Sequence, residues 1–279
     1  VYLSIHRRWI VRELGAEQRE LANGRQLIES DADLLGWSLS PDNLQIGYVE
    51  SWGDMGRLYV RPVADGPTRE LAATLGNVDL AWSPDGERVA YTAYHRGEAH
   101  IWIVSADSEG DGDGEAEVFA DTRVGMSSML LWPAADSIVY DRVGGGLSLL
   151  TPSTGREREL LPEGAPAFHR MISDSKGRSL VGYSLRDPRG LWVLNLDGSP
   201  PRSLLPGLNF PTDWEDTVLF TSMSHPERIM AIAPEGGEPE LLRELEVGDE
   251  RPICELGVGG TLICGSEISE RSVHFARLP

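Results

Sequence analysis

Short apolar runs separated by polar turns follow one another along the chain. The clearest copy of this pattern spans residues 80–120, where one run ends in Trp82-Ser83-Pro84-Asp85-Gly86. Apolar segments then follow at residues 88–91, 101–104 and 117–119. Runs of this length, bounded by Pro-Asp-Gly or Asp-Gly turns, are typical of β-strands and not of helices. The segment therefore predicts a unit of four short strands.

The same unit recurs through the sequence. Its copies can be aligned on the residue that closes the second strand, and successive copies lie 37 to 49 residues apart. The aligned residues are Tyr2, Tyr48, Tyr91, Tyr140, Tyr183, Phe220 and Cys264. Four-stranded units repeated around a ring are the pattern of a β-propeller. The predicted fold class is therefore all-β, a propeller of four-stranded antiparallel blades.

The best copy, residues 82–91, resembles the repeat of the TolB-type propellers, also called tryptophan-aspartate-like repeats. Ser40-Pro41-Asp42-Asn43 and Leu196-Asp197-Gly198-Ser199 are similar to the same pattern. The copies at residues 132–136 and 213–216 depart from it. The resemblance covers nearly the whole chain and implies a toroid of blades with a central channel and, usually, a binding role. It implies no particular partner, because such repeats accompany many functions.

The number of blades has two readings. Seven pairs of second and third strands favour seven blades, although the first copy lacks an inner strand and the last lacks an outer strand. In the TolB pattern a strand from the C-terminus completes a partial N-terminal blade. Residues 253–256 could be that strand, which would give six blades and leave residues 261–279 over. Alternatively, the missing inner strand precedes residue 1 in a longer chain. We expect seven blades.

Length and composition fit one all-β domain over residues 1–279. No apolar run approaches the roughly 20 residues of a membrane-spanning helix. The first residue is valine and not methionine, which suggests a processed or excised segment of a longer protein. A secretion signal or anchor removed from the N-terminus would place the protein in a bacterial periplasm or another extracytoplasmic compartment.

The formal net charge is −19, from 44 acidic and 25 basic side chains. A field of this sign repels phosphate backbones, so we expect no binding to nucleic acid. It is compatible with a basic partner, but solubility is the favoured explanation. We therefore draw no binding site from the charge alone.

The two cysteines lie on strands that a turn near residues 257–260 folds together, so Cys254 and Cys264 should be close to opposite each other. The expected separation of opposed Cβ atoms, roughly 4.5–5.5 Å, is slightly long for a relaxed disulfide. Two reduced cysteines acting as small apolar side chains are favoured, and a disulfide is the alternative. No CxxC pair or neighbouring histidine pair indicates zinc.

Few residues suggest chemistry. The segments around Ser38 and Ser184 do not complete the GxSxG pattern of a serine hydrolase. His6, His95 and His225 fall in equivalent turns, where histidines converging on one point could bind a metal, but solvated turn residues are the favoured interpretation. The acidic insertion at residues 107–117 resembles a calcium loop in composition only, and a solvated hairpin is favoured. We accordingly assign no catalytic, cofactor or metal residue and expect no cofactor.

Two functional hypotheses follow. The first is a non-enzymatic scaffold that binds a protein or peptide through its rim or its central channel. The alternative is a propeller cap or metal-dependent enzyme domain, whose catalytic partner or metal this chain does not reveal. The sequence predicts neither the partner nor the oligomeric state.

Overall fold

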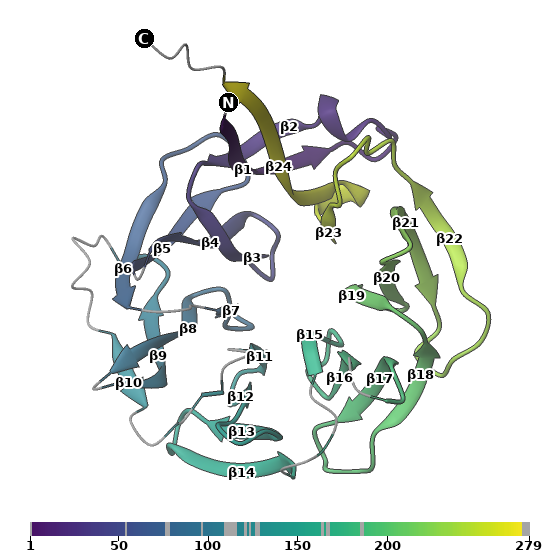
Figure 1. Ribbon diagram of the computed structural model, residues 1–279. Helices are drawn as coiled ribbons and strands as arrows, with labels where there is room; N and C mark the ends of the chain where they lie inside the picture. The colour runs from purple at the N-terminus through teal and green to yellow at the C-terminus, as the bar shows by residue number, and fades with distance from the viewer. Residues whose placement is uncertain are drawn as a thin grey trace.

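The computed structural model describes residues 2–274 except for positions 54, 76–78, 96, 109–115, 120–121, 123, 126–128, 163–164, 166–167 and 185–186. Within the described residues, strands form six four-stranded antiparallel sheets arranged as the blades of a propeller around a central axis (Figure 1). We use the word channel for the region between the innermost strands. The all-β propeller predicted from the repeats is confirmed. The innermost strands of the six blades are β3, β7, β11, β15, β19 and β23.

Five blades are built from consecutive strands, running from the channel to the rim. Blade one contains β3 (Asp33–Leu39), β4 (Gln45–Trp52), β5 (Met55–Pro62) and β6 (Arg69–Leu75). Blade two contains β7 (Leu80–Trp82), β8 (Arg88–His95), β9 (Glu98–Ser105) and β10 (Glu117–Phe119). Blade three contains β11 (Leu130–Ala134), β12 (Ser137–Asp141), β13 (Leu147–Thr151) and β14 (Arg156–Leu161).

Blade four contains β15 (Phe168–Ser173), β16 (Ser179–Ser184), β17 (Gly190–Asn195) and β18 (Arg202–Pro206). Blade five contains β19 (Asn209–Trp214), β20 (Val218–Ser222), β21 (His225–Ile232) and β22 (Glu240–Glu244). Two single turns of 3-10 helix, η1 (Leu21–Asn23) and η2 (Val258–Gly260), lie in connections.

The sixth blade joins both ends of the described chain, and we call it the closing blade. Its order from the channel outward is β23 (Ile253–Leu256), β24 (Leu262–His274), β1 (Tyr2–Leu14) and β2 (Arg25–Ser30). The expectation of seven blades is wrong, because the first and last copies of the repeat share one sheet. The six-blade alternative correctly placed residues 253–256 as an inner strand. It left residues 261–279 over, whereas β24 is the second strand of the same blade.

The Ser-Pro-Asp turns of blades one and two use the same hydrogen bonds. In blade two, Ser83 Oγ donates to Asp85 Oδ1 (2.5 Å) and accepts from the backbone N–H of Arg88 (2.9 Å). The Asp85 carboxylate also accepts from the N–H of Glu87 (3.0 Å). Ser40 and Asp42 repeat this arrangement in blade one. The motif is therefore a side-chain clamp that connects the first strand of a blade to its second.

Apolar side chains fill the spaces between neighbouring blades. The cluster between blades one and two contains Val49, Leu58, Leu80 and Trp82, and all four are buried. The Trp82 indole Nε1 donates to the carbonyl of Ser38 in blade one (3.1 Å), so this side chain joins two blades. Equivalent clusters occupy the other junctions.

Trp102 and Trp192, in contrast to Trp82, are only partly buried. They lie on third strands, closer to the rim than Trp82. Trp102 stacks on Tyr91 of its own blade, with ring centroids 6.4 Å apart. Only Trp82 of the three occupies the fully packed junction between blades.

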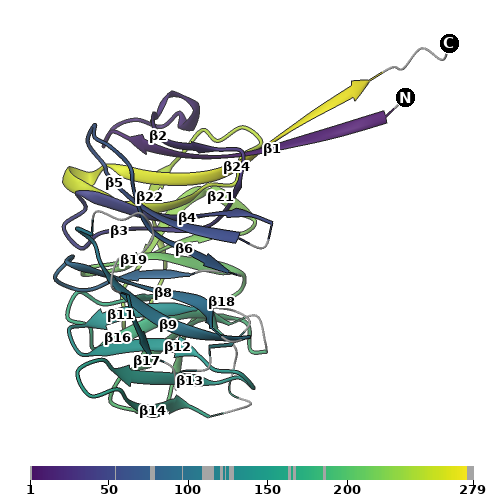
Figure 2. The ribbon, with the colours of Figure 1, turned by 90° about the vertical axis from the view of Figure 1, so that its left-hand side faces the viewer.

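The two faces of the ring differ. Because strands alternate in direction, the turns between second and third strands share one face with the connections from each outer strand to the next blade. In the closing blade this position is held by the β1–β24 pair, which stays in register from Tyr2–His274 to Leu14–Leu262. Residues 2–8 and 268–274 of that pair, here called the arm, project away from the ring (Figure 2). We call the face from which they project the arm face.

Candidate functional site

Four charged side chains from four different blades belong to the inner strands around the channel. Asp79 immediately precedes β7, Arg170 lies in β15, Asp213 in β19 and Glu255 in β23. Arg170 Nη2 donates to Glu255 Oε1 at 3.2 Å. Since β19 lies between β15 and β23 in the ring, this ion pair reaches past blade five and joins two blades that are not neighbours (Figure 1). We call these four residues the channel network.

A bulge in β15 presents Arg170 to the network. The register of β15 against β16 shifts between His169 and Met171, and Arg170, the residue between them, has φ of 39°. A positive φ is uncommon for a residue with a Cβ atom and is found where surrounding contacts hold it. Besides its pairing with Glu255, Arg170 donates from Nε to the carbonyl of Pro211 in blade five (3.0 Å).

The three carboxylates connect inner strands across blade boundaries. Glu255 Oε2 accepts from the N–H of Leu39 (3.2 Å), which joins the closing blade to blade one. Asp213 Oδ2 accepts from the N–H of Leu256 (3.3 Å), which joins blade five to the closing blade. Each of these bonds gives a partner to a backbone N–H group at the edge of an inner strand, where no neighbouring strand pairs with it.

Asp79 makes the corresponding connection between blades two and three. Its Oδ2 atom accepts from the N–H of Leu130, and its Oδ1 atom accepts from the N–H of Leu80, both at 3.0 Å. The carboxylate is thus held on both sides by backbone donors. Together, the three acidic residues fasten three of the six blade junctions from within the channel.

The channel environment shifts the titration of these acids. Burial raises the pKa of Asp79 to about 7, against hydrogen bonds from Leu130 and Leu80 that favour the charged form. Burial also raises the pKa of Glu255 to about 7, and the nearby Arg170 only partly offsets it. The pKa of Asp213 is raised by burial as well. Removal from water therefore outweighs the single guanidinium that the network contains.

A surface feature distinct from the channel network lies on the arm face. Six large apolar side chains there are exposed: Trp52, Met55, Tyr94, Val143, Leu208 and Met223. Five belong to the ends of second strands, the starts of third strands or the turns between them, and Leu208 connects blades four and five. Trp52 is 57% exposed and Val143 67%. Apolar side chains of this size from four blades and from one connection between blades are thus available to solvent on one face.

The histidines singled out from the sequence do not form a described site. His225 is exposed and its Nδ1 lies 3.1 Å from Glu227 Oε1 on the same strand. The side chains of His6 and His95 lie outside the described residues. Among the side chains that the structure describes, no group of three or more His, Cys, Asp or Glu residues has the geometry to hold a metal ion.

Most of the acidic insertion, residues 109–115, also lies outside the described residues, so the structure does not test calcium binding there. At its start, Asp107 pairs with Arg69 of blade one (3.5 Å). Of the two serines considered as nucleophiles, Ser184 is fully buried within β16, and Ser38 is half-buried within β3. Neither lies on the sharp exposed turn that a hydrolase nucleophile requires.

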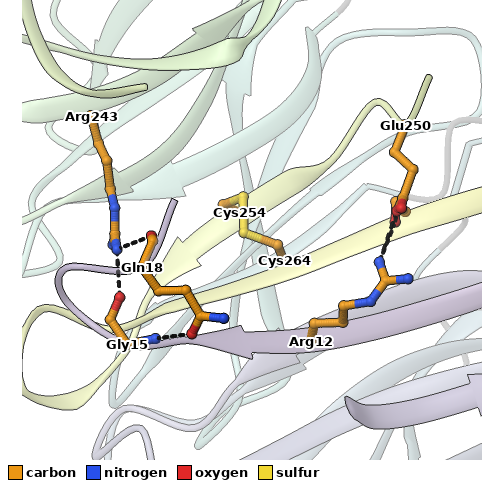
Figure 3. Close-up of a disulfide and its surroundings, with 8 residues drawn as sticks. Arg12, Gly15, Gln18, Arg243, Glu250, Cys254 and Cys264 are labelled. Carbon is orange, nitrogen blue, oxygen red and sulfur yellow. Dashed lines mark hydrogen bonds and ion pairs between the residues drawn. A yellow bond between two sulfur atoms is a disulfide. The ribbon is translucent and has the colours of Figure 1, made fainter. Parts of the chain in front are cut away.

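Cys254 and Cys264 form a disulfide between β23 and β24, and the two reduced cysteines favoured from sequence are a wrong prediction (Figure 3). The ladder places them directly opposite each other with a Cα–Cα distance of 4.1 Å. That spacing is typical of the closer of the two pair types in an antiparallel ladder. Both side chains are buried, with exposed fractions of 2% and 0%.

Further contacts near the disulfide fasten the closing blade (Figure 3). Arg12 of β1 pairs with Glu250 (2.8 Å) in the segment that leads into β23. Arg243 of β22 donates to the carbonyl oxygens of Gly15 and Gln18 (both 2.5 Å) in the connection from β1 to β2. Ion pairs and hydrogen bonds therefore join the N-terminal strands of this blade to the C-terminal part of the chain.

Sequence reasoning missed the channel network. A usable signal was present, since Asp79, Asp213 and Glu255 are isolated charges next to or within short apolar inner strands. The sequence gives no comparable sign that these residues lie close together, because they are 42 to 176 positions apart. The repeat register could have placed Asp213 and Glu255 at the same level, whereas the Arg170 bulge gives no trace in the sequence.

Comparisons with known proteins support the fold. No protein-family model and no curated protein sequence matches the chain. Among solved structures, a putative TolB from Agrobacterium tumefaciens aligns with a TM-score of 0.66 at 16% identity, covering 94% of this chain and 99% of that one. TolB from Acinetobacter baumannii aligns with a TM-score of 0.61 at 13% identity over 93% of this chain, which spans 63% of that protein.

A chain from a nidogen/laminin complex gives a TM-score of 0.64 at 11% identity, with 86% of this chain and 97% of that one covered. At these identities the likeness concerns the fold, which is that of a TolB-like β-propeller. In addition, none of the helices in the described part of the chain has the length and apolar character needed to cross a membrane.

Proposed function

We propose that this chain is a non-enzymatic scaffold that binds a protein or peptide partner on its arm face, around the mouth of the channel. The observation that carries the proposal is the set of exposed apolar side chains on that face, Trp52, Met55, Tyr94, Val143, Leu208 and Met223. Large apolar side chains grouped on one surface mark interaction sites. Tryptophan and tyrosine are among the residues that contribute most to the energy of protein interfaces.

The opposite face offers a useful contrast. Away from the arm face, the exposed large apolar residues among those described include Leu44 in the β3–β4 connection, Val258 in η2, and Leu241 and Leu242 at the start of the outer strand β22. None of these four is aromatic. The arm face therefore fits a partner that supplies several apolar contacts at once. The TolB-like fold supports the same interpretation, by analogy between folds.

We infer an extracytoplasmic location, such as a bacterial periplasm. The buried disulfide between Cys254 and Cys264 supports it, because disulfides persist mainly in oxidising compartments. The net charge of −19 supports a partner other than nucleic acid. A non-enzymatic role rests on the placement of the candidate serines within strands, since catalysis needs a nucleophile accessible to substrate and oriented by a base.

The experiment uses the purified chain as bait in an envelope extract, followed by measurement of binding to each recovered partner in purified form. Trp52→Ala combined with Tyr94→Ala should raise Kd at least tenfold, because both side chains are exposed and available for contact. Leu44→Ala combined with Val258→Ala on the opposite face is the matched control and should leave Kd unchanged. Loss of binding in the control pair alone would contradict the assignment of the face.

A further inference from the structure

The two strands of the arm each have one open edge. In the closing blade, β1 pairs with β2 at residues 9–13, and β24 pairs with β23 at residues 262–265. Among the described strands, residues 2–8 and 268–274 therefore have each other as their only neighbours. An isolated ribbon of two strands is at best marginally stable in water. The arm thus lacks the further strand that would stabilise it.

The outer edges of the six blades, in contrast, are interrupted. The outer strands β2, β6, β14, β18 and β22 each have a register shift against the neighbouring strand, and β10 is only three residues long. Bulges and short edge strands are common means of preventing sheets from pairing edge to edge. The β1–β24 pair has no shift, and residues 2–8 and 268–274 contain no proline, glycine or lysine. The rim edges are thus protected from pairing, and the arm edges are not.

The pairing of β23 with β24 tells which backbone groups of β24 point to its open edge. Cys254 and Cys264 form the closer type of antiparallel pair, with Cα atoms 4.1 Å apart, and residues of such a pair exchange no backbone hydrogen bonds. The N–H and C=O groups of Cys264 therefore point toward β1. These directions alternate along the strand, whose register against β1 has no shift. The backbone groups of Glu267, Ser269 and Arg271 consequently point to the open edge.

We propose that this edge of β24 pairs antiparallel with the same edge of a second copy of the chain, about a twofold axis at Ser269. The two arms then form one sheet of four strands, with the two β24 strands at its centre. A sheet needs at least three strands for independent stability. Because both copies use the same edge, the contact closes as a dimer. Figure 2 shows the arm projecting clear of the ring, where a second arm can lie beside it.

The charges along β24 favour this register. An axis at Ser269 places Glu267 opposite Arg271 of the second copy, and the symmetry repeats the pair. Opposite charges that face each other on neighbouring strands are stabilising, and like charges are destabilising. An axis at Glu270 or Arg271 would instead place two like charges opposite each other. Glu267 lies 3.5 Å from Arg7 of its own chain and keeps 34% of its side chain exposed, so a second guanidinium can approach it.

The open edge of β1 is less suited to pairing with itself. Residues 2–8 include Arg7 and Arg8 and no acidic residue, so no register of this edge against itself gives a pair of opposite charges. The dimer therefore uses β24. This inference is independent of the proposed binding role, since it concerns backbone groups of the arm and not the exposed apolar side chains of the ring.

The first experiment measures the mass of the full chain by light scattering over a series of concentrations. Wild type should be a dimer that dissociates on dilution. Ser269→Pro removes the N–H group at the centre of the contact and should raise the Kd of dimerisation roughly tenfold or more. Ile5→Pro is the matched control, because Ile5 pairs with Arg271 and has its N–H on the open edge of β1. Its Kd should equal that of wild type.

A second experiment tests the register by cross-linking. Both cysteines of the chain are in the buried disulfide, so a cysteine introduced in the arm supplies the only free thiol. Ser269→Cys should give a disulfide-linked dimer under mild oxidation, because residues paired in this way have Cα atoms about 5.5 Å apart. Ser272→Cys is the control, since its equivalent in the second copy would lie six residues along the strand, about 20 Å away. It should cross-link about tenfold more slowly or less.

A wild-type chain that stays monomeric at every concentration would overturn the proposal. Equal cross-linking of the two cysteine variants would also overturn it, and so would a dimer that Ile5→Pro abolishes and Ser269→Pro retains. The mass of wild type and the two cysteine variants decide the question even if a proline variant does not fold.

Discussion

Individual residues in this propeller act mainly by fixing where neighbouring blades meet. Asp79 uses both carboxylate oxygens on backbone donors of blades two and three. Gly265 of β24 allows the indole of Trp37 in blade one to approach closely, since a Cβ atom at that position would lie 2.4 Å from Trp37 Nε1. Asp79 places a carboxyl group at a junction between blades, and Gly265 lacks a side chain, so that an aromatic ring fits beside it.

Asp79→Asn should flatten the dependence of stability on pH. The pKa of Asp79 is raised from 3.8 to about 7, so the folded state binds the extra proton between these values. The associated stability is fully present below about pH 4 and is lost as the pH rises to 7. With about 1.4 kcal/mol for each pKa unit, the effect amounts to a few kcal/mol at most. Urea unfolding at pH 5, 6, 7 and 8 measures the slope.

Asp42→Asn is the control for that experiment. The hydrogen bond from Ser40 lowers the pKa of Asp42 below 3.8, so its stabilisation is lost only as the pH falls through that lower value. The slope between pH 5 and pH 8 should stay as in wild type. If Asp79→Asn keeps the wild-type slope, the assigned protonation of Asp79 is wrong.

Gly265→Ala should destabilise the protein by about 1–3 kcal/mol, the usual cost of inserting a methyl group into a packed site. The added atom would displace the Trp37 indole at the junction between the closing blade and blade one. Gly15→Ala is a suitable control, since Gly15 is exposed and the nearest atom to a new Cβ lies 4.0 Å away. Equal unfolding midpoints in urea for the two variants would refute the close approach.

At the level of elements, local turns connect the first strand of a blade to its second. The clamp of Ser83, Asp85 and Arg88 explains why the Ser-Pro-Asp pattern appears at this point of the repeat. Side-chain bonds to backbone N–H groups stabilise the turn independently of the rest of the ring. This local character is the reason that the strands of blades one and two were predictable from sequence.

Ser83→Ala should cost about 1–3 kcal/mol, because it leaves the N–H of Arg88 without its acceptor at a site where Ser83 is only 1% exposed. Ser153→Ala removes an exposed serine that donates to Asp136 in blade three and should change stability by less than about 0.5 kcal/mol. Thermal or urea unfolding of both variants distinguishes the buried clamp from the exposed turn. A Ser83→Ala protein as stable as wild type would show that the clamp contributes nothing.

For the whole molecule, the decisive feature is closure of the ring by strands from both ends of the chain. The β1–β24 pair joins them over thirteen residue pairs. The disulfide then fixes β23 to β24 across a loop with a sequence separation of 10. A cross-link of this length stabilises the folded state by roughly 3 kcal/mol in the loop-entropy model.

Cys254→Ala combined with Cys264→Ala should therefore lower the free energy of unfolding by about 2–4 kcal/mol. Non-reducing urea unfolding measures the difference, and wild type in the presence of reductant should approach the double variant. A double variant with unchanged stability would mean that the bond does not constrain the closing blade in solution.

The sequence by itself determined the class of fold. Alternating apolar runs, Pro-Asp-Gly turns and the copies aligned on Tyr48, Tyr91 and Tyr140 are local features, and local hydrogen bonds enforce them. The tertiary structure decided how the ends meet. The count of six blades and the channel network depend on residues brought together by closing a ring. The disulfide of Cys254 with Cys264 crosses a single local turn, and the close Cα–Cα approach of 4.1 Å decided it. The ion pair of Arg170 with Glu255 joins positions 85 apart. No local pattern encodes that distance, because it is set by the packing of the whole ring.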